Sequence, residues 1–215
     1  MGDVFSMTFM TFQRDIRQMI REKRRELSRA TRMECARRLV ANLVNSPLFQ
    51  RSRRVACFFP QDGEIDLSLL FPHLFSTRKT AYLPVVHGKK LWFLPFDADT
   101  PLVRNKYGIP EPELSPSLRC APLSLDLVLA PLVAFDGTGH RLGMGGGYYD
   151  RTFGYLLHRR VFVKPMLVGV AYGFQEVTVL PPRNPWDVPL DGVVTEEGWR
   201  WMPGKALKKP SMAFF

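Results

Sequence analysis

Long apolar runs, paired cysteines and clustered histidines are all missing from this 215-residue sequence. No apolar run approaches the roughly 18 to 20 residues that span a bilayer, and no apolar stretch after a basic start marks a secretory signal. We therefore expect a cytoplasmic protein without a membrane segment. The three cysteines, Cys35, Cys57 and Cys120, lie far apart and indicate reduced thiols rather than a disulfide scaffold. The four histidines form no HExxH or HxH pattern, which argues against a zinc enzyme.

Positive charge, by contrast, is in excess. The chain has 30 Lys and Arg residues against 20 Asp and Glu, a net charge of +10, and residues 14–54 contain thirteen basic residues against four acidic ones. Such a balance predicts an anionic partner, which could be a nucleic acid, a nucleotide or a polyanionic metabolite. Within this region we expect Arg24, Arg25, Arg37 and Arg38 to form a solvated basic face.

Hydrophobic spacing predicts two helices in the basic region and alternating strands and helices after it. Ile16, Met19 and Ile20 indicate an amphipathic first helix. Thr31-Arg-Met-Glu34 has the form of a capping box, followed by an apolar stripe from Ala36 to Val44. Helices are also expected after Asp66 and from Tyr148. Short runs rich in β-branched and aromatic residues predict strands at 55–59, 81–86, 91–96, 127–133 and 166–171.

This alternation predicts a single layered α/β domain with a largely parallel sheet flanked by helices. We expect the domain to cover 13–203, between a flexible N-terminus at 1–12 and a basic C-terminal tail at 204–215. Segments rich in proline, such as the one around Pro110 and Pro112, are expected in loops or at sheet edges.

The most informative segment runs from Phe135 to Asp150, where a buried strand leads into a turn, a glycine-rich loop and a helix start. Four glycines in the five positions 143–147 allow the backbone to approach a ligand and to turn its N–H groups inward, as in a phosphate cradle. Arg141 could fork onto phosphate oxygens, and Asp150 could bind magnesium beside them. The spacing matches neither the P-loop nor the GxGxxG dinucleotide pattern. A glycine cluster alone would equally fit a tight structural turn.

The string Phe135-Asp136-x-x-Gly139-x-Arg141-Leu142-Gly143-x-Gly145-x-Gly147-Tyr148-Tyr149-Asp150 resembles the signature of the 5-formyltetrahydrofolate cyclo-ligase family, also called methenyltetrahydrofolate synthetases. The resemblance spans nearly the whole chain and includes Gly63-Glu64-Ile65-Asp66 and Asp187-Val-Pro-Leu-Asp191. It implies an ATP-dependent, magnesium-requiring conversion of 5-formyltetrahydrofolate to 5,10-methenyltetrahydrofolate. The fold implied is similar to sugar-phosphate isomerases and coenzyme A transferases. ATP would phosphorylate the formyl oxygen, and the neighbouring amine would then close the ring with loss of phosphate.

The resemblance also implies roles for individual residues. Glu64, Arg141 and Tyr148 would be catalytic, and Asp150 and Asp187 would hold Mg²⁺. The folate would contact Glu64 and the loop residues Met144, Gly145, Gly146, Gly147 and Tyr148. ATP, the co-substrate, would contact Arg14, Arg17, Arg141, Leu142, Gly143, Met144, Gly145, Gly146, Gly147, Tyr148 and Tyr149. Gln13 stands where the family often has Lys or Arg, and Arg14 could supply that charge only from another helix face, about 100° around.

Other interpretations stay open at this point. The basic helices could belong to an RNA-binding module, although no RNP-like aromatic pattern is present. A sugar-phosphate isomerase or transferase of related fold is a second alternative. Glu64 could be a solvated turn residue, Asp187 a turn cap, and one of Tyr148 and Tyr149 a core aromatic. We expect a monomer that takes 5-formyltetrahydrofolate and ATP, and not nucleic acid, as its partners.

Overall fold

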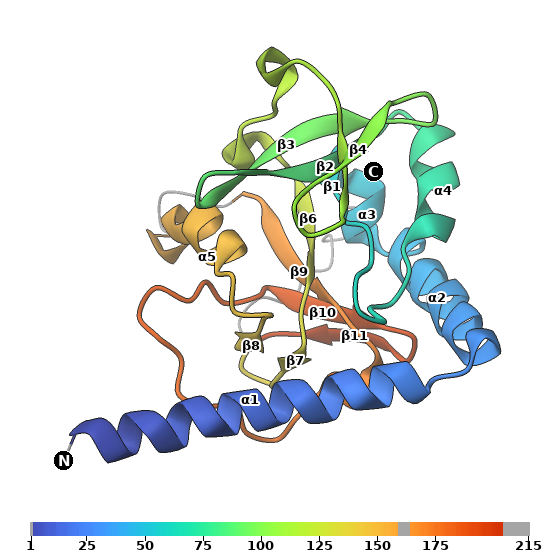
Figure 1. The fold of residues 1–215 in the computed structure, drawn as a ribbon. Coiled ribbons are helices and arrows are strands. Elements are labelled where there is room, and N and C mark those ends of the chain that lie inside the picture. The colour runs from blue at the N-terminus through green and yellow to red at the C-terminus, as the bar shows by residue number, and fades with distance from the viewer. Residues whose placement is uncertain (1, 159–163, 204–215) are drawn as a thin grey trace, which may run out of the picture.

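Seven strands form the central sheet of the computed structural model, which describes residues 2–158 and 164–203 (Figure 1). In spatial order they are β11 (Gly198–Trp201), β10 (Gly192–Thr195), β9 (Met166–Val170), β6 (Leu127–Pro131), β1 (Arg54–Ala56), β2 (Thr80–His87) and β3 (Lys90–Phe96). The five inner strands are parallel, whereas β11 and β3 pair antiparallel at the two edges. The largely parallel sheet predicted from the sequence is thus confirmed. The expected tail at 204–215 lies outside the described residues.

Two hydrophobic cores lie on opposite faces of this sheet, because successive strand residues point to opposite sides. Leu127 and Leu129 belong to one core, while Val128 and Ala130 belong to the other. The first core is covered by α2 (Arg29–Val44), α3 (Pro47–Arg51) and α4 (Phe71–Phe75), and the second by α5 (Tyr148–Phe153), as Figure 1 shows. The result is the layered arrangement that alternating strands and helices require.

The second helix, α2, begins three residues before the predicted capping box. Its N-cap is Ser28, whose hydroxyl accepts a hydrogen bond from the Thr31 backbone N–H at 3.1 Å. The placement of the cap at Thr31 was therefore wrong, because the serine satisfies the free N–H groups one turn earlier. The predicted apolar stripe is confirmed: Ala36 and Leu43 are among its buried residues.

The first helix, α1 (Gly2–Glu26), runs across one edge of the layers in Figure 1. Its Ile16 and Ile20 are buried against Leu142 and neighbouring residues. The helix includes all but the first residue of the stretch 1–12, which we expected to be flexible.

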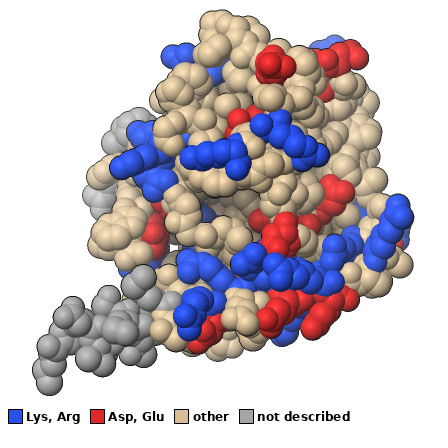
Figure 2. Space-filling view, in the orientation of Figure 1, with Lys and Arg blue, Asp and Glu red and all other residues tan. Residues whose placement is uncertain are grey.

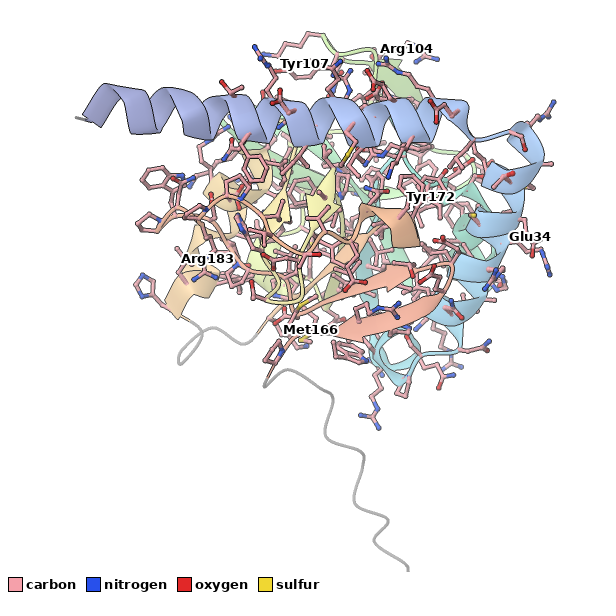
Figure 3. The ribbon with its side chains drawn as sticks, turned by 90° about the horizontal axis from the view of Figure 1, so that it is seen from below. Glu34, Arg104, Tyr107, Met166, Tyr172 and Arg183 are labelled. Atoms are coloured by element: carbon pink, nitrogen blue, oxygen red, sulfur yellow. The ribbon has the colours of Figure 1, made fainter. Side chains whose placement is uncertain are left out.

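Several short elements complete the fold. β4 (Leu102–Arg104) and β5 (Pro110–Pro112) form an edge hairpin, as the prolines require, and β7 (Ala134–Phe135) pairs with β8 (Arg141–Leu142). Figure 3, seen from the α1 side, shows the first hairpin projecting beyond α1 with Arg104 and Tyr107. β10 and β11 were not predicted, because strands of four residues are too short to show a clear alternation.

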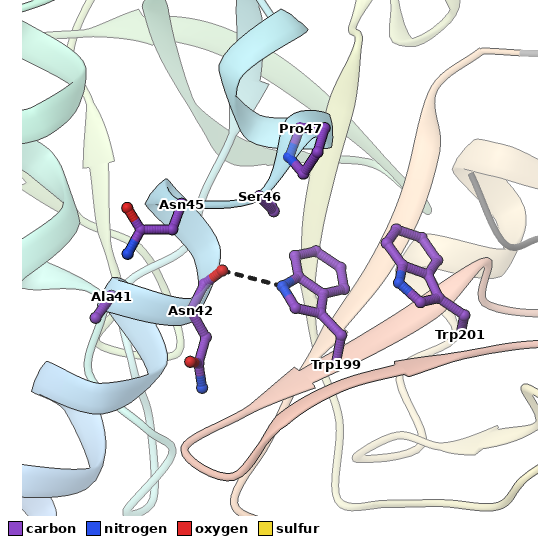
Figure 4. Close-up of a pocket in the computed structure, with 7 residues that line it drawn as sticks. All are labelled: Ala41, Asn42, Asn45, Ser46, Pro47, Trp199 and Trp201. Atoms are coloured by element: carbon purple, nitrogen blue, oxygen red, sulfur yellow. Dashed lines mark hydrogen bonds between the residues drawn. The ribbon is translucent and has the colours of Figure 1, made fainter. Parts of the chain in front are cut away.

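A cavity of about 450 Å³ lies between the end of α2 and β11 (Figure 4). Trp199 and Trp201 stack there with ring centroids 4.7 Å apart, and the Trp199 indole N–H donates to the Asn42 carbonyl at 3.0 Å. None of the residues that line this cavity belongs to the site predicted from the sequence. Among the described residues, no helix combines the length and apolar character needed to cross a membrane.

Candidate active site

Glu64 and the glycine-rich loop follow two neighbouring parallel strands. The chain leaves β1 at Ala56 before the turn that holds Glu64, and it leaves β6 at Pro131 before the loop at 143–147. Because β1 and β6 pair in parallel, their carboxyl ends meet at the same edge of the sheet. In open α/β sheets this edge is where ligands bind. Strand order therefore brings together two segments that lie about eighty residues apart.

The backbone of the loop needs glycine at particular positions. Gly145 has a φ of +97° and Gly147 a φ of +61°, in the region that side chains disfavour. A Cβ at Gly147 would lie 2.7 Å from the Arg151 guanidinium, whereas a Cβ at Gly145 would meet nothing within 4 Å. The space beside Gly145 is open, and Met144 is 53% exposed. The loop thus combines a fixed backbone with an accessible face.

Arg17 joins α1 to this loop. Its Nε donates to the Gly143 carbonyl at 2.9 Å, and its Nη2 donates to the Gln13 side chain at 3.4 Å. Burial lowers the pKa of the Arg17 guanidinium. Arg14 forms an ion pair with Asp15, at 3.6 Å, and its side chain is 73% exposed. The structure therefore brings Arg17 to the loop, with Gln13 bonded to Arg17, and leaves Arg14 in solvent.

Arg141 pairs with Asp150 at 2.6 Å and donates to the Val188 carbonyl. Only 6% of its side chain is exposed. In the structure Arg141 orients Asp150. The expected contact between Arg141 and phosphate stays a prediction, and it would have to use the remaining N–H groups of the guanidinium. Leu142 is buried in the core, which leaves only its backbone for a nucleotide.

The two carboxylates expected to hold magnesium lie close together. Asp150 Oδ1 also accepts from the Val188 backbone N–H at 3.1 Å, directly after Asp187. Asp187 Oδ2 accepts from the Asn184 backbone N–H at 2.9 Å, so this carboxylate does cap a turn. Within the described residues, Oδ2 of Asp150 and Oδ1 of Asp187 accept no hydrogen bond.

These two carboxylate oxygens fit Mg²⁺, which binds one or two carboxylates and completes its shell with water and phosphate oxygens. No cluster of three or more His, Cys, Asp or Glu side chains able to hold a metal occurs in the described part of the chain. Asp150 and Asp187 thus suit an ion that arrives with a phosphate ligand, and they form no complete cage by themselves.

Glu64 lies half-buried in its turn. Its Oε2 accepts from the Gln61 backbone N–H at 3.0 Å, and burial raises the pKa of its carboxyl to about 7. Arg24 opposes this rise in the Glu64 pKa, and Glu64 in turn contributes to the raised pKa of Tyr149. Glu64 is therefore an ionisable group at neutral pH beside the helix that follows the glycine loop.

The sequence analysis missed Tyr107 and misplaced Arg24. The hydroxyl groups of Tyr107 and Tyr148 lie 2.8 Å apart, so the β4–β5 hairpin reaches the start of α5. An aromatic residue before Gly108-Ile-Pro-Glu-Pro112 was the available signal for it. Arg24 is only 1% exposed, which contradicts the solvated basic face we expected there. Figure 2 shows that basic side chains nevertheless gather along α1 and above a hollow in the same face.

Comparisons with known proteins identify the family of this chain and agree with its fold. The model of the 5-formyltetrahydrofolate cyclo-ligase family matches residues 10–196. The 5-formyltetrahydrofolate cyclo-ligase of Escherichia coli strain K12 is 39% identical over 188 residues, covering 85% of this chain and 100% of its own length. The enzyme of Haemophilus influenzae is 38% identical over 182 residues, covering 83% of this chain and 94% of its own. The solved structure of Aquifex aeolicus 5,10-methenyltetrahydrofolate synthetase superimposes with a TM-score of 0.76 at 35% identity, covering 94% of this chain and 100% of that one.

Proposed function

Because this chain belongs to the 5-formyltetrahydrofolate cyclo-ligase family, we propose that it converts 5-formyltetrahydrofolate to 5,10-methenyltetrahydrofolate at the expense of ATP. The observation that carries the proposal is the placement of an open glycine loop beside two carboxylates and an ionisable Glu64. The loop N–H groups suit a nucleotide, the two aspartates suit a magnesium ion, and the Glu64 carboxylate suits the N–H groups of a folate.

In the proposed reaction the formyl oxygen attacks the γ-phosphorus of ATP and ADP leaves. The neighbouring amine nitrogen then attacks the activated formyl carbon and closes the ring, and the phosphate leaves with the proton of that nitrogen as hydrogen phosphate. No nucleophile from the protein is required. The enzyme has to hold the reactants in line and to balance the phosphate charge, so catalysis depends on positioning and electrostatics.

The residues of the chain divide this work between two ends of the site. Backbone N–H groups at 143–147 and the guanidinium of Arg17 suit the triphosphate, because both offer donors to phosphate oxygens. Glu64 suits the pterin ring, whose N–H groups are donors that a carboxylate accepts. Tyr148 begins α5 directly after the loop, and its hydroxyl is hydrogen-bonded to that of Tyr107.

Asp150 and Asp187 would hold Mg²⁺, which supplies charge neutralisation at the phosphates. Arg141 orients Asp150 and, by pairing with it, limits the charge of the carboxylate pair while the ion is away. Asn184 fixes Asp187 in a similar manner. The two carboxylates are thus held in place by the protein, while each keeps one oxygen available for the ion.

The RNA-binding alternative loses support from the direction of the basic side chains. Arg24 donates to a backbone carbonyl of the protein, and Arg21 and Arg25 pair with Asp62. These groups are occupied within the fold and offer less charge to an external phosphate backbone.

The test is incubation of the purified protein with 5-formyltetrahydrofolate, ATP and Mg²⁺, following the near-ultraviolet absorbance of the methenyl product. Omission of each component in turn is the control. Product formation that persists without ATP, or a complete absence of product with all three, would contradict the proposal.

A further inference from the structure

Arg24 is a buried cation with unmade hydrogen bonds. Only 1% of it is exposed, and its Nη2 donates to the Leu132 carbonyl. Its Nε and Nη1 are buried and, among the described residues, have no hydrogen-bond partner. Burial lowers the pKa of this guanidinium. Leaving charged donors unpaired in the interior is costly, so their retention calls for a reason beyond packing.

The turn that holds Glu64 is seated directly on Arg24. A Cβ at Gly63 would lie 3.1 Å from the Arg24 Cβ and 3.5 Å from its carbonyl oxygen, so the turn approaches α1 as closely as only glycine allows. On either side, Arg21 and Arg25 pair with Asp62, the latter at 3.0 Å. This part of α1 therefore fixes the turn both by close packing at Gly63 and by ion pairs with Asp62.

The charges around Glu64 come from three elements. Arg24 of α1 lowers the pKa of the Glu64 carboxyl, while Asp62 of the same turn and burial raise it. Tyr149 of α5 also lies within electrostatic range of Glu64. Asp62 is already paired with two arginines, so Arg24 is the cation left to balance Glu64.

We propose that Arg24 is the positioning residue of Glu64, and that its buried positive charge favours the charged form of the Glu64 carboxylate, which accepts hydrogen bonds from the N–H donors of a pterin ring. This inference rests on the proposed function for the identity of the ligand. Arg24 acts through Glu64 and does not touch the substrate. Without the cation, burial alone would favour the protonated carboxyl, which offers fewer acceptors.

The first experiment needs no catalysis. The titration of Glu64 is followed by ¹³C NMR of its carboxyl in the ligand-free protein, for wild type, Arg24→Met and Lys23→Met. Met keeps the length of the side chain and removes the charge, and Lys23 is an exposed neighbour on the same helix. We expect Arg24→Met to raise the pKa of Glu64 by about one unit or more, because a nearby opposite charge typically shifts a carboxyl by that amount. Lys23→Met should leave it nearly unchanged. An unshifted Glu64 in folded Arg24→Met would overturn the proposal.

The second experiment separates positioning from a purely structural role. Arg24→Met should raise the KM for folate about fivefold or more at pH 7, because a rise of about one unit from a pKa of about 7 cuts the charged fraction of Glu64 from about one half to about one tenth. The KM for ATP should change by less than about twofold. Arg24→Lys, which keeps the charge, should fall between wild type and Arg24→Met. In a Glu64→Gln background, Arg24→Met should add almost nothing, because the group it acts on is gone.

Equal losses in both backgrounds, or parallel losses for ATP and folate, would mean that Arg24 serves only the fold. If Arg24→Met does not fold, Arg24→Gln, which also removes the charge, carries both experiments, and an unshifted Glu64 pKa in that variant would count against the proposal. A wild-type protein that does not turn over 5-formyltetrahydrofolate would refute the proposed function alone, because the NMR titration still decides the role of Arg24.

Discussion

At the scale of single residues, the protonation of Glu64 links the site to the stability of the fold. Burial raises the pKa of its carboxyl from 4.5 to about 7 in the folded chain. Between these values the folded chain binds a proton more tightly than the unfolded chain does. Stability contributed by the protonated group is therefore present below pH 4.5 and is lost as the pH rises to 7.

Glu64→Gln mimics the protonated carboxyl and should remove this loss. We expect the variant to gain stability over wild type as the pH rises from 5 to 8, by on the order of 1 to 3 kcal/mol. Urea denaturation of both proteins at the two pH values measures the difference. A stability difference that does not depend on pH would show that Glu64 does not titrate in this range.

Gly145 allows a second test at this scale, with Gly88 as its match. Both have positive φ, +97° and +57°, and a Cβ at either position would meet nothing within 4 Å. Alanine should therefore cost each about 1 to 2 kcal/mol through backbone strain. Only Gly145→Ala should also weaken ATP binding, because Gly88 lies in the turn between β2 and β3. Calorimetry with ATP compares the two, and equal ATP affinities would remove Gly145 from the cradle.

The residues of the candidate site could be chosen from the sequence, but the residues that they contact could not. Glycine spacing and the carboxylates pointed to the loop, to Asp150 and to Glu64. Residue type favours exposure for both Arg24 and Arg25. Helical spacing does distinguish them, because buried Arg24 lies four residues after Ile20 on the apolar face of α1, whereas Arg25, whose side chain is 60% exposed, lies off that face. The spacing does not show that the Glu64 turn covers Arg24. The pairing of Arg141 with Asp150 depends in the same way on tertiary structure.

At the scale of elements, α1 contacts both parts of the candidate site, the glycine loop and the Glu64 turn. Arg17 bonds the glycine loop through Gly143, and two turns later Arg24 supports the turn of Glu64. The apolar residues Ile16 and Ile20 anchor this part of the helix in the core. One helix thus contacts both the glycine loop, where we propose that the nucleotide binds, and the Glu64 turn, where we propose that the folate binds.

Arg17→Ala should raise the apparent dissociation constant for ATP by about tenfold or more, because a charge-assisted hydrogen bond contributes about 1.5 to 3 kcal/mol. Arg14→Ala removes the same charge three residues earlier, from a side chain that is 73% exposed, and should have little effect. Equilibrium binding of ATP to both variants gives the comparison. A larger loss for Arg14→Ala would mean that the nucleotide approaches another face of α1.

The longer elements were predictable because each repeats its pattern. The strands at β2, β3, β6 and β9 and the buried stripe of α2 were expected from the spacing of apolar residues. β10 and β11 offer only four residues each, and β10 joins the sheet by pairing with β9, which lies more than twenty residues earlier in the chain. The start of α2 at Ser28 shows a similar limit, since two hydroxyl residues three positions apart both fit an N-cap.

At the scale of the whole molecule, the candidate site is a meeting point of distant segments. Arg17, Glu64, the loop at 143–147 and Asp187 come from α1, from the turn after β1, from the segment after β8 and from the approach to β10. Unfolding any of these segments removes part of the site. Ligands that bind across it should therefore stabilise the entire fold, by about 2.7 kcal/mol at one hundred times their dissociation constant.

Thermal unfolding should reveal this linkage and the place of the metal in it. For a chain of this length about 2.7 kcal/mol corresponds to a rise in Tm of roughly 5 to 10 °C, and we expect ATP with Mg²⁺ to produce it. ATP with EDTA should produce a much smaller rise in Tm, because Asp150 and Asp187 then face the phosphates without a cation between them.

Asp150→Asn keeps the shape of the side chain but halves the negative charge of the carboxylate pair. Without ligand it should lower the Tm, because the ion pair with Arg141 is lost. With ATP it should also lose most of the Mg²⁺-dependent rise in Tm. Arg37→Gln, which breaks an exposed ion pair with Glu34, is the matched control and should keep the full Mg²⁺-dependent rise in Tm. If Mg²⁺ with ATP raised the Tm of Asp150→Asn as much as that of wild type, the ion would have to bind elsewhere.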